Sequence, residues 1–322
     1  MKVTKAMVHE DLQPMYGYAA LLPRLIRFRF VVKLLNWMGR RNRTLPSADG
    51  IAIEEVTIPS RSEDTEIRTL LYKPEGHKAD LPIMLYCHGG GYILGNPEQF
   101  HDAIVQFIRT RPCIVIAPDY RKALTAPFPA GFNDCFDTLL WARDNADELS
   151  GKKTRMIIAG HSAGGGLTAA LSLKARDTGD IDVAFQMPIY PMIDDTQPDD
   201  ATRAMSAPVW DTNANRLGWD AYLAGLHSAG EAVTPYAAAA RSEDYRGLPP
   251  TITFVGDMEP FCEETRAYVS ALKAVEVDTA FREYPGCFHG FDFFKAPISR
   301  DAQDFMYNSF ADFYDRYVTG GS

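Results

Sequence analysis

The chain has 322 residues, of which 46% are hydrophobic and 23% are charged, and its formal net charge is −9. This composition excludes a wholly disordered chain, a collagen and a coiled coil, and the acidic balance argues against nucleic acid as a partner of the whole molecule. No uncharged apolar run approaches the roughly 20 residues of a membrane-spanning helix, and the first residues lack the apolar core of a signal peptide.

The cysteine pattern points to free thiols. The chain has five cysteines, which are widely spaced and form no CxxC pair: Cys87, Cys113, Cys135, Cys262 and Cys287. Nothing in this spacing indicates a zinc or redox site, so we expect neither a metal nor a cofactor. Without a signal peptide, reduced thiols in the cytoplasm are the simplest interpretation.

The N-terminal segment is basic, whereas the remainder of the chain is acidic. Residues 1–45 contain nine Lys/Arg and two acidic residues. Within residues 14–43, apolar side chains recur at helical spacing, namely Leu21, Leu25, Phe28, Val32 and Leu35. A membrane-surface helix and a helix packed over the rest of the protein both fit this stripe. The basic residues surround the stripe and form no single polar face, which favours packing.

From residue 51 onward the pattern predicts strands that alternate with helices. Residues 51–58 and 65–72 alternate in hydrophobicity and predict an antiparallel strand pair. Near-continuous apolar runs follow, typical of strands buried on both faces, at 83–87, 113–117, 156–159, 185–190 and 251–255. Helical patterns separate most of them, at 98–110, 131–148, 163–177 and 260–275. A short strand at 280–284 and a helix at 299–317 complete a mostly parallel α/β sheet.

Residues 192–247 interrupt this alternation, because they contain no clear strand and are too long for an ordinary connection. Residues 213–223 are helical in pattern. We expect an insertion at one edge of the sheet, packed against the N-terminal helix. Its aromatic residues Trp210, Trp219 and Tyr222 fit either a substrate pocket or the core of the insertion.

The strongest chemical motif is Gly160-His161-Ser162-Ala163-Gly164, which follows a predicted strand and precedes a predicted helix. That context is the one required by a nucleophile elbow, in which a sharp turn leaves no room for side chains beside the serine. Ser162 is therefore the candidate nucleophile, with a purely structural serine as the alternative.

A second motif, His88-Gly89-Gly90-Gly91, follows the strand predicted at 83–87. Consecutive glycines expose backbone N–H groups, so Gly90 and Gly91, with the N–H of Ala163, could form an oxyanion hole. A glycine-rich turn and a phosphate cradle are the alternatives, but the Gly-Lys-Ser/Thr of a P-loop does not follow.

Together these motifs resemble the hormone-sensitive-lipase-like branch of the α/β-hydrolases, bacterial carboxylesterases in particular. The resemblance covers roughly residues 50–317 and rests on YCHGGGYILGN (86–96), APDYR (117–121), PFPA (127–130), GHSAGG (160–165), EPFCEE (259–264) and FHGF (288–291). It implies an eight-stranded sheet with a helical cap. The cap would comprise residues 1–45 and the insertion 192–247, and the catalytic domain would comprise 46–191 and 248–319.

The resemblance also implies the remaining catalytic residues. His289, in the loop after the last predicted strand, matches the position of the family's catalytic histidine. The acid departs from the usual Asp-Pro-Leu motif, since Glu259 precedes the proline and Asp257 stands two residues earlier. Position in the motif favours Glu259. A glutamate can take this role, because either carboxylate can accept a hydrogen bond from the imidazole. Asp257 remains the alternative.

The predicted function is therefore that of a carboxylesterase that cleaves small esters of short or medium acyl chains through an acyl-enzyme. An amidase, deacetylase or peptidase could use the same three groups. A non-catalytic protein that binds small molecules on this fold is a further alternative. The resemblance implies a monomer or a homodimer.

Overall fold

A computed structural model describes residues 1–41, 43–77 and 80–320. It contains one eight-stranded sheet in the order β1-β2-β4-β3-β5-β6-β7-β8. The strands are β1 (Ile51–Pro59), β2 (Glu66–Pro74), β3 (Ile83–Cys87), β4 (Ile114–Pro118), β5 (Met156–His161), β6 (Val183–Ile189), β7 (Thr251–Gly256) and β8 (Thr279–Tyr284). Each predicted strand is confirmed.

The pairing of the strands explains their composition. β1 and β2 are antiparallel, as predicted, and β2 also pairs antiparallel with β4. The remaining neighbours are parallel. Every residue of β3, β4 and β5 is buried, because helices cover both faces of the sheet at its centre.

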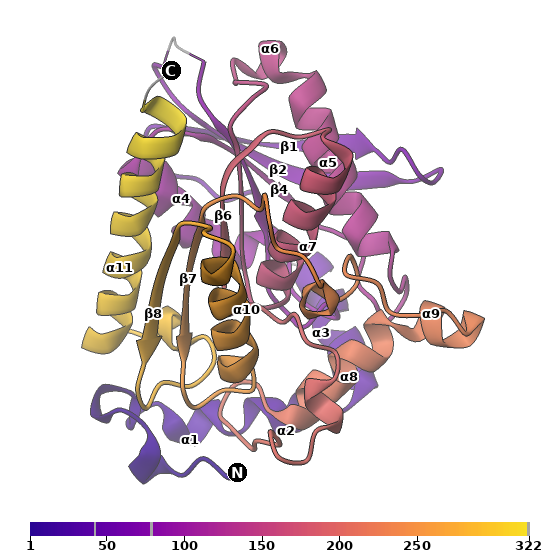
Figure 1. Cartoon of the computed structure of the whole chain (residues 1–322), viewed down its shortest axis with the longest axis vertical. Helices are drawn as coiled ribbons and strands as arrows, with labels where there is room; N and C mark the ends of the chain where they lie inside the picture. The colour runs from indigo at the N-terminus through magenta and orange to yellow at the C-terminus, as the bar shows by residue number, and fades with distance from the viewer. Residues whose placement is uncertain (42, 78–79, 321–322) are drawn as a thin grey trace.

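Two layers of helices enclose the sheet (Figure 1). α4 (His101–Thr110) and α11 (Pro297–Phe313) cover one face, and α5 (Ala130–Asp144), α7 (Ala163–Thr178) and α10 (Cys262–Ala274) cover the other. α6 (Ala146–Leu149) follows α5, and a π-helical turn, Tyr314–Thr319, follows α11. This three-layer arrangement confirms the predicted α/β class.

The N-terminal segment forms three short helices instead of the one predicted: α1 (Tyr16–Ala19), α2 (Leu22–Ile26) and α3 (Arg29–Arg41). The prediction that the apolar stripe forms the packing face is also wrong. Only Val32 of the stripe is buried, whereas Leu21, Leu25, Phe28 and Leu35 are about half exposed. The break between α2 and α3 rotates the later residues relative to the earlier ones, so no continuous inner stripe exists.

The insertion contains α8 (Thr212–Tyr222) and α9 (Ala224–Ala229), and it contacts the N-terminal segment as expected. The carbonyl of Ala19 accepts the N–H of Val209 at 2.8 Å, and Arg27 pairs with Asp211 at 3.1 Å. Asp211 also caps α8, since its carboxylate accepts the N–H of Ala214 at 2.9 Å. Figure 1 shows α1, α2 and α8 near the end of the sheet where β7 and β8 terminate.

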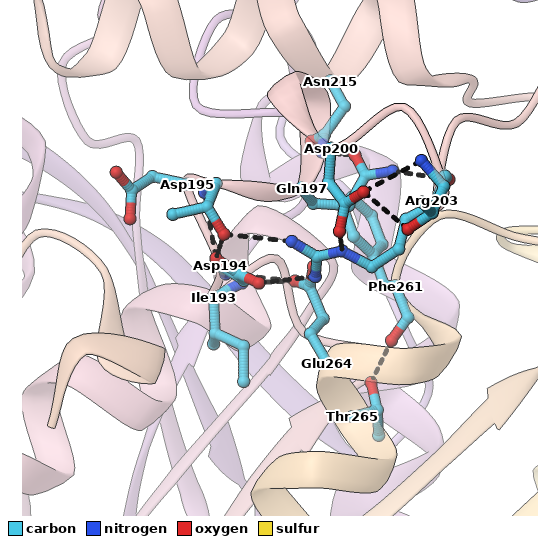
Figure 2. A network of polar contacts seen from close by, with 12 residues as sticks. Ile193, Asp194, Asp195, Gln197, Asp200, Arg203, Asn215, Phe261, Glu264 and Thr265 are labelled. Atoms are coloured by element: carbon cyan, nitrogen blue, oxygen red, sulfur yellow. Dashed lines mark hydrogen bonds and ion pairs between the residues drawn. The ribbon is translucent and has the colours of Figure 1, made fainter. Parts of the chain in front are cut away.

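A partly buried polar network anchors the start of the insertion to α10 (Figure 2). Arg203 pairs with Asp194 at 2.6 Å and with Asp200 at 2.9 Å. Glu264 accepts the N–H groups of Ile193 at 2.7 Å and of Asp194 at 3.3 Å. Burial raises the pKa of Glu264 well above its usual value. These contacts fix the insertion to the helix that directly follows the candidate acid.

Candidate active site

Ser162 occupies the sharp turn between β5 and α7. Its φ of +59° lies in the left-handed region, an unusual conformation for a residue other than glycine. A Cβ atom on Gly160 would overlap the carbonyl of Gly164, and one on Gly164 would overlap the carbonyl of Cys87. The glycines on either side of the serine are therefore required by close backbone packing, as the elbow motif predicts.

The loop after β8 brings His289 to this serine. His289 Nε2 lies 2.8 Å from Ser162 Oγ, and His289 Nδ1 lies 2.5 Å from Glu259 Oε2. All three side chains are buried. Because a carboxylate only accepts hydrogen bonds, Nδ1 carries a proton and Nε2 is free to accept one from the serine hydroxyl.

Neighbouring groups hold both Glu259 and His289 in place. The second carboxylate oxygen of Glu259 accepts the N–H of Gly256 at 3.1 Å. The rings of Tyr190 and Phe261 pack edge-on against the imidazole, with centroids 4.8 Å and 4.9 Å away. The imidazole is thereby oriented by packing as well as by its hydrogen bonds.

Asp257, the alternative acid, lies elsewhere. Its Oδ1 accepts the backbone N–H of Gly286 at 2.6 Å, which ties the end of β7 to the loop before His289. Burial raises the pKa of Asp257, and the Gly286 N–H opposes that effect. The structure thus brings Glu259, and not Asp257, into contact with the imidazole.

The glycine loop after β3 passes directly beside the serine. A Cβ atom on Gly89 would lie 3.5 Å from Ser162 Cβ. Gly90 and Gly91 have φ values of +125° and +58°, and a side chain on Gly91 would overlap the ring of Trp210. Trp210 therefore borders this loop, whereas Trp219 and Tyr222 pack against Tyr92, with ring centroids 5.4 Å and 4.0 Å away.

Sequence reasoning missed Lys122, which supports the same loop from behind. Lys122 Nζ lies 2.9 Å from His88 Nε2 and 2.9 Å from Asp119 Oδ1. His88 Nδ1 lies 2.7 Å from the carbonyl oxygen of Gly89. Burial lowers the pKa of His88 well below its usual value, and the Lys122 charge lowers it further. The signal in the sequence is a lysine directly after the APDYR motif, between an apolar strand and an apolar helix.

A second buried group of polar residues, also missed, lies behind the elbow. Asp292 accepts a hydrogen bond from Tyr190 at 2.9 Å, and its other oxygen lies 3.8 Å from His161 Nε2. His161 Nδ1 lies 2.7 Å from the hydroxyl of Tyr86. Burial raises the pKa of Asp292 to about 7 and lowers the pKa of His161 to about 3. Asp292 follows His289 by three residues, yet its hydrogen-bond partner is Tyr190.

Comparison with known proteins assigns the fold and the chemistry. A family model described as the α/β-hydrolase fold matches residues 84–293. The chain belongs to the α/β-hydrolase family. It is 33% identical over 232 residues to the carboxylesterase NlhH of Mycobacterium tuberculosis, covering 70% of this chain and 72% of that protein. An arylesterase of Saccharolobus solfataricus is 32% identical over 71% of this chain and 74% of its own.

Two solved structures that resemble this chain are also esterases, in agreement with its relatives in sequence. A bacterial heroin esterase superposes with a TM-score of 0.84 at 28% identity, covering 97% of this chain and 99% of that one. The esterase LipW of Mycobacterium marinum gives a TM-score of 0.82 at 26% identity, covering 97% of each chain. The matches confirm the predicted resemblance to the hormone-sensitive-lipase-like branch, and with it a serine hydrolase of the carboxylesterase type.

Among the described residues, no helix has the length and apolar character needed to cross a bilayer.

Proposed function

We propose that Ser162, His289 and Glu259 form the catalytic triad of this esterase and that its substrates are small esters with short or medium acyl chains. The observation that carries the proposal is the unbroken hydrogen-bonded path from Ser162 Oγ through both imidazole nitrogens to Glu259. The order serine, acid, histidine along the chain is that of α/β-hydrolases.

The geometry supports the following reaction. Ser162 Oγ attacks the acyl carbonyl carbon while His289 Nε2 takes the hydroxyl proton, and Glu259 stabilises the imidazolium that forms. The N–H groups of Gly90, Gly91 and Ala163 are the proposed donors to the oxyanion. His289 then gives its proton to the leaving alkoxide oxygen as the C–O bond breaks. In the second half, His289 deprotonates a water molecule that attacks the acyl carbon. The bond from that carbon to Ser162 Oγ breaks, His289 returns the proton to Oγ, and the carboxylic acid is released.

The proposed cap comprises residues 1–45 and 192–247, over a catalytic domain of 46–191 and 248–319. The contacts of Ala19 and Arg27 with the insertion support this division. The close approach of Trp210 to Gly91 supports an insertion that lies beside the proposed oxyanion hole. We further propose a reducing, cytoplasmic environment, supported by five buried cysteines that are all free thiols.

The test is hydrolysis of p-nitrophenyl esters from acetyl to palmitoyl by wild type, Ser162→Ala and a matched control. Ser228 is exposed and remote in sequence from every motif, so Ser228→Ala is a suitable control. We expect turnover of the short and medium esters, a loss of kcat on the order of 10⁶-fold in Ser162→Ala, and no change in the control. Full activity in Ser162→Ala would refute the triad.

The same assay distinguishes the alternative activities. An anilide of the same acyl group is compared with each ester, and faster cleavage of the anilide would assign an amidase. A folded protein that binds these esters and turns over none of them would assign a binding protein.

A further inference from the structure

The outward side of α3 is apolar, the reverse of an ordinary surface helix. Phe30, Leu34, Trp37 and Met38 follow a spacing of i, i+4, i+7 and i+8 and so share one face. That face is the exposed one, with exposed fractions of 69%, 49%, 50% and 44% in the same order. The inward side contacts the protein through buried Val32 and through Asn36, which donates to the carbonyl of Ile93 at 2.8 Å.

The apolar surface continues onto the two preceding helices. Four further large apolar or aromatic side chains there are more than a third exposed: Tyr18, Leu21, Leu22 and Leu25. Monomeric soluble proteins rarely expose a contiguous apolar surface of this kind without a binding role. We call the exposed side of α1–α3 the N-terminal face.

Basic residues flank this face. Arg29, Lys33 and Arg40 lie on one flank of α3, at i, i+4 and i+11, and all three are exposed. Residues 16–41 contain six basic residues and no acidic one. Within the part of the chain that the structure describes, Arg24, Arg29, Lys33 and Arg40 form no ion pair. The segment thus presents apolar and cationic groups together on a chain whose net charge is −9.

The combination of apolar and cationic side chains indicates which kind of partner this face binds. A second copy of the chain would bury the apolar side chains. A two-fold contact, however, would also place the six basic residues of this segment close to the same six residues of the other copy, and the segment contains no acidic residue to neutralise them. An anionic lipid surface satisfies both features, since its headgroups attract the cations and its acyl boundary accepts the apolar side chains.

We propose that the N-terminal face docks this protein on the surface of an anionic membrane, with α3 lying in the plane of the interface. The docked face borders the active-site loops: Tyr18 packs on Phe294, five residues after His289, with ring centroids 5.8 Å apart, and Asn36 holds the loop that follows Gly91. The proposal goes beyond the proposed hydrolysis and does not depend on it.

Trp37 reports docking directly. It is half exposed, Trp141 is partly exposed on α5, and Trp210 and Trp219 are buried. Full-length protein is mixed with vesicles of phosphatidylcholine alone or with phosphatidylglycerol added. Salt is held at about 0.01 M, where the Debye length is about 30 Å, or at about 1 M, where it is about 3 Å. We expect co-sedimentation and a blue shift of tryptophan emission with the anionic vesicles at low salt, and a large loss of binding at high salt.

Two sets of variants separate the contributions. The triple substitution Arg29→Gln, Lys33→Gln, Arg40→Gln should weaken binding on the order of 100-fold, at about one kcal/mol for each charge. Its control, Arg109→Gln, Lys273→Gln, Arg300→Gln, removes three exposed charges from other faces and should bind as wild type does. Leu34→Gln with Trp37→Gln should weaken binding at least about tenfold.

The outcomes decide the proposal. Absence of binding to anionic vesicles at low salt overturns it, as does an equal loss in the control triple variant. A dimer in light scattering that dissociates in Leu34→Gln, together with no vesicle binding, would assign the face to a second copy instead. Binding is also measured on Ser162→Ala, so that failure of docking and failure of catalysis are separate results.

Discussion

The ammonium group of Lys122 lies 2.9 Å from Nε2 of His88, on the side of the ring opposite Nδ1, which lies 2.7 Å from the carbonyl oxygen of Gly89. An ammonium group can only donate and a carbonyl can only accept, so the two contacts fix the tautomer with the proton on Nδ1. Lys122 thus holds the histidine that holds the peptide immediately before Gly90. The buried cation is a positioning residue for the proposed oxyanion loop.

Replacing Lys122 with methionine should loosen this loop. The substitution leaves His88 Nε2 buried without a donor, which costs about 1–3 kcal/mol of unfolding free energy. We expect kcat to fall with little change in KM, because the proposed donors act on the transition state. Lys153→Met is the control, since Lys153 is exposed and its pair with Asp147 should contribute less than about 1 kcal/mol. Urea denaturation and steady-state kinetics on both variants provide the comparison.

The three carboxylates near His289 should differ sharply in their effect on the rate. Glu259→Gln keeps the volume but places an amide at Nδ1, and we expect kcat to fall on the order of 10⁴-fold, as for other triads with a substituted acid. Asp257→Asn should lose less than about tenfold, because the Asp257 carboxylate accepts its hydrogen bond from the backbone of Gly286 and not from the imidazole. Asp292→Asn is the third arm, since Asp292 pairs with Tyr190.

The ranking of these variants in a single ester assay checks the assignment. A larger loss in Asp257→Asn or in Asp292→Asn than in Glu259→Gln would move the acid role to that residue. Circular dichroism on each variant separates a catalytic loss from unfolding.

The pH dependence of stability should reveal the buried Asp292 and His161. Burial raises the pKa of Asp292 from 3.8 to about 7, so the folded state holds a proton that the unfolded state has released, and stability is lost as pH rises through that interval. Burial lowers the pKa of His161 from 6.5 to about 3, so stability is lost as pH falls through that interval. The two effects oppose each other where the intervals overlap.

Single substitutions should separate the two effects. Relative to wild type, Asp292→Asn should gain unfolding free energy as pH rises from 3.8 to about 7. His161→Gln should show the opposite trend, losing stability relative to wild type as pH rises from about 3 to 6.5. Each slope is at most about 1.4 kcal/mol per pH unit. Denaturant titrations at several pH values measure both, and parallel curves for the three proteins would contradict the prediction.

Gly91→Ala should damage the site through two separate effects. Its φ of +58° is strained for alanine, and the added methyl group would overlap the ring of Trp210. Gly179→Ala is a control for strain alone, since Gly179 has a φ of +68° and nothing within 4 Å of the added atom. We expect Gly179→Ala to lose about 1 kcal/mol of stability with normal kcat.

In Gly91→Ala, displacement of the loop should lower kcat on the order of 100-fold, the effect of losing one oxyanion donor. Adding Trp210→Leu removes the overlap and should restore part of kcat. Equal rates in the single and double variants would show that Trp210 does not constrain the loop.

The positions of the strands and the elbow could be predicted because each depends on local pattern. Apolar runs buried on both faces mark strands of a parallel sheet, and the glycines around Ser162 mark a turn that admits no side chain. The resemblance added His289 and ranked Glu259 above Asp257, and the structure places Glu259 against the imidazole. Each of these features corresponds to a pattern that spans only a few residues of the sequence.

The features that the sequence analysis missed depend on contacts between distant segments. Lys122 reaches His88 across 34 residues, and Tyr190 reaches Asp292 across 102. The amino-acid type of a charged residue does not show whether its side chain is buried or exposed, so only the packed structure distinguishes the two.

The N-terminal stripe shows the same division between sequence and tertiary structure. Its periodicity correctly indicates helix, but periodicity does not say which face meets the protein. The breaks between the three helices, and the polar contacts of Arg27 and Asn36, turn most of the apolar side chains outward. The sequence by itself determined the fold class and the candidate nucleophile, because apolar strand runs and the glycines around Ser162 follow from local backbone geometry. The family resemblance supplied the candidate base His289 and ranked the two candidate acids. Only the tertiary structure showed that Glu259 contacts the imidazole, that Lys122 is buried against His88, and that the apolar side of α3 faces outward, because these depend on what lies opposite each side chain.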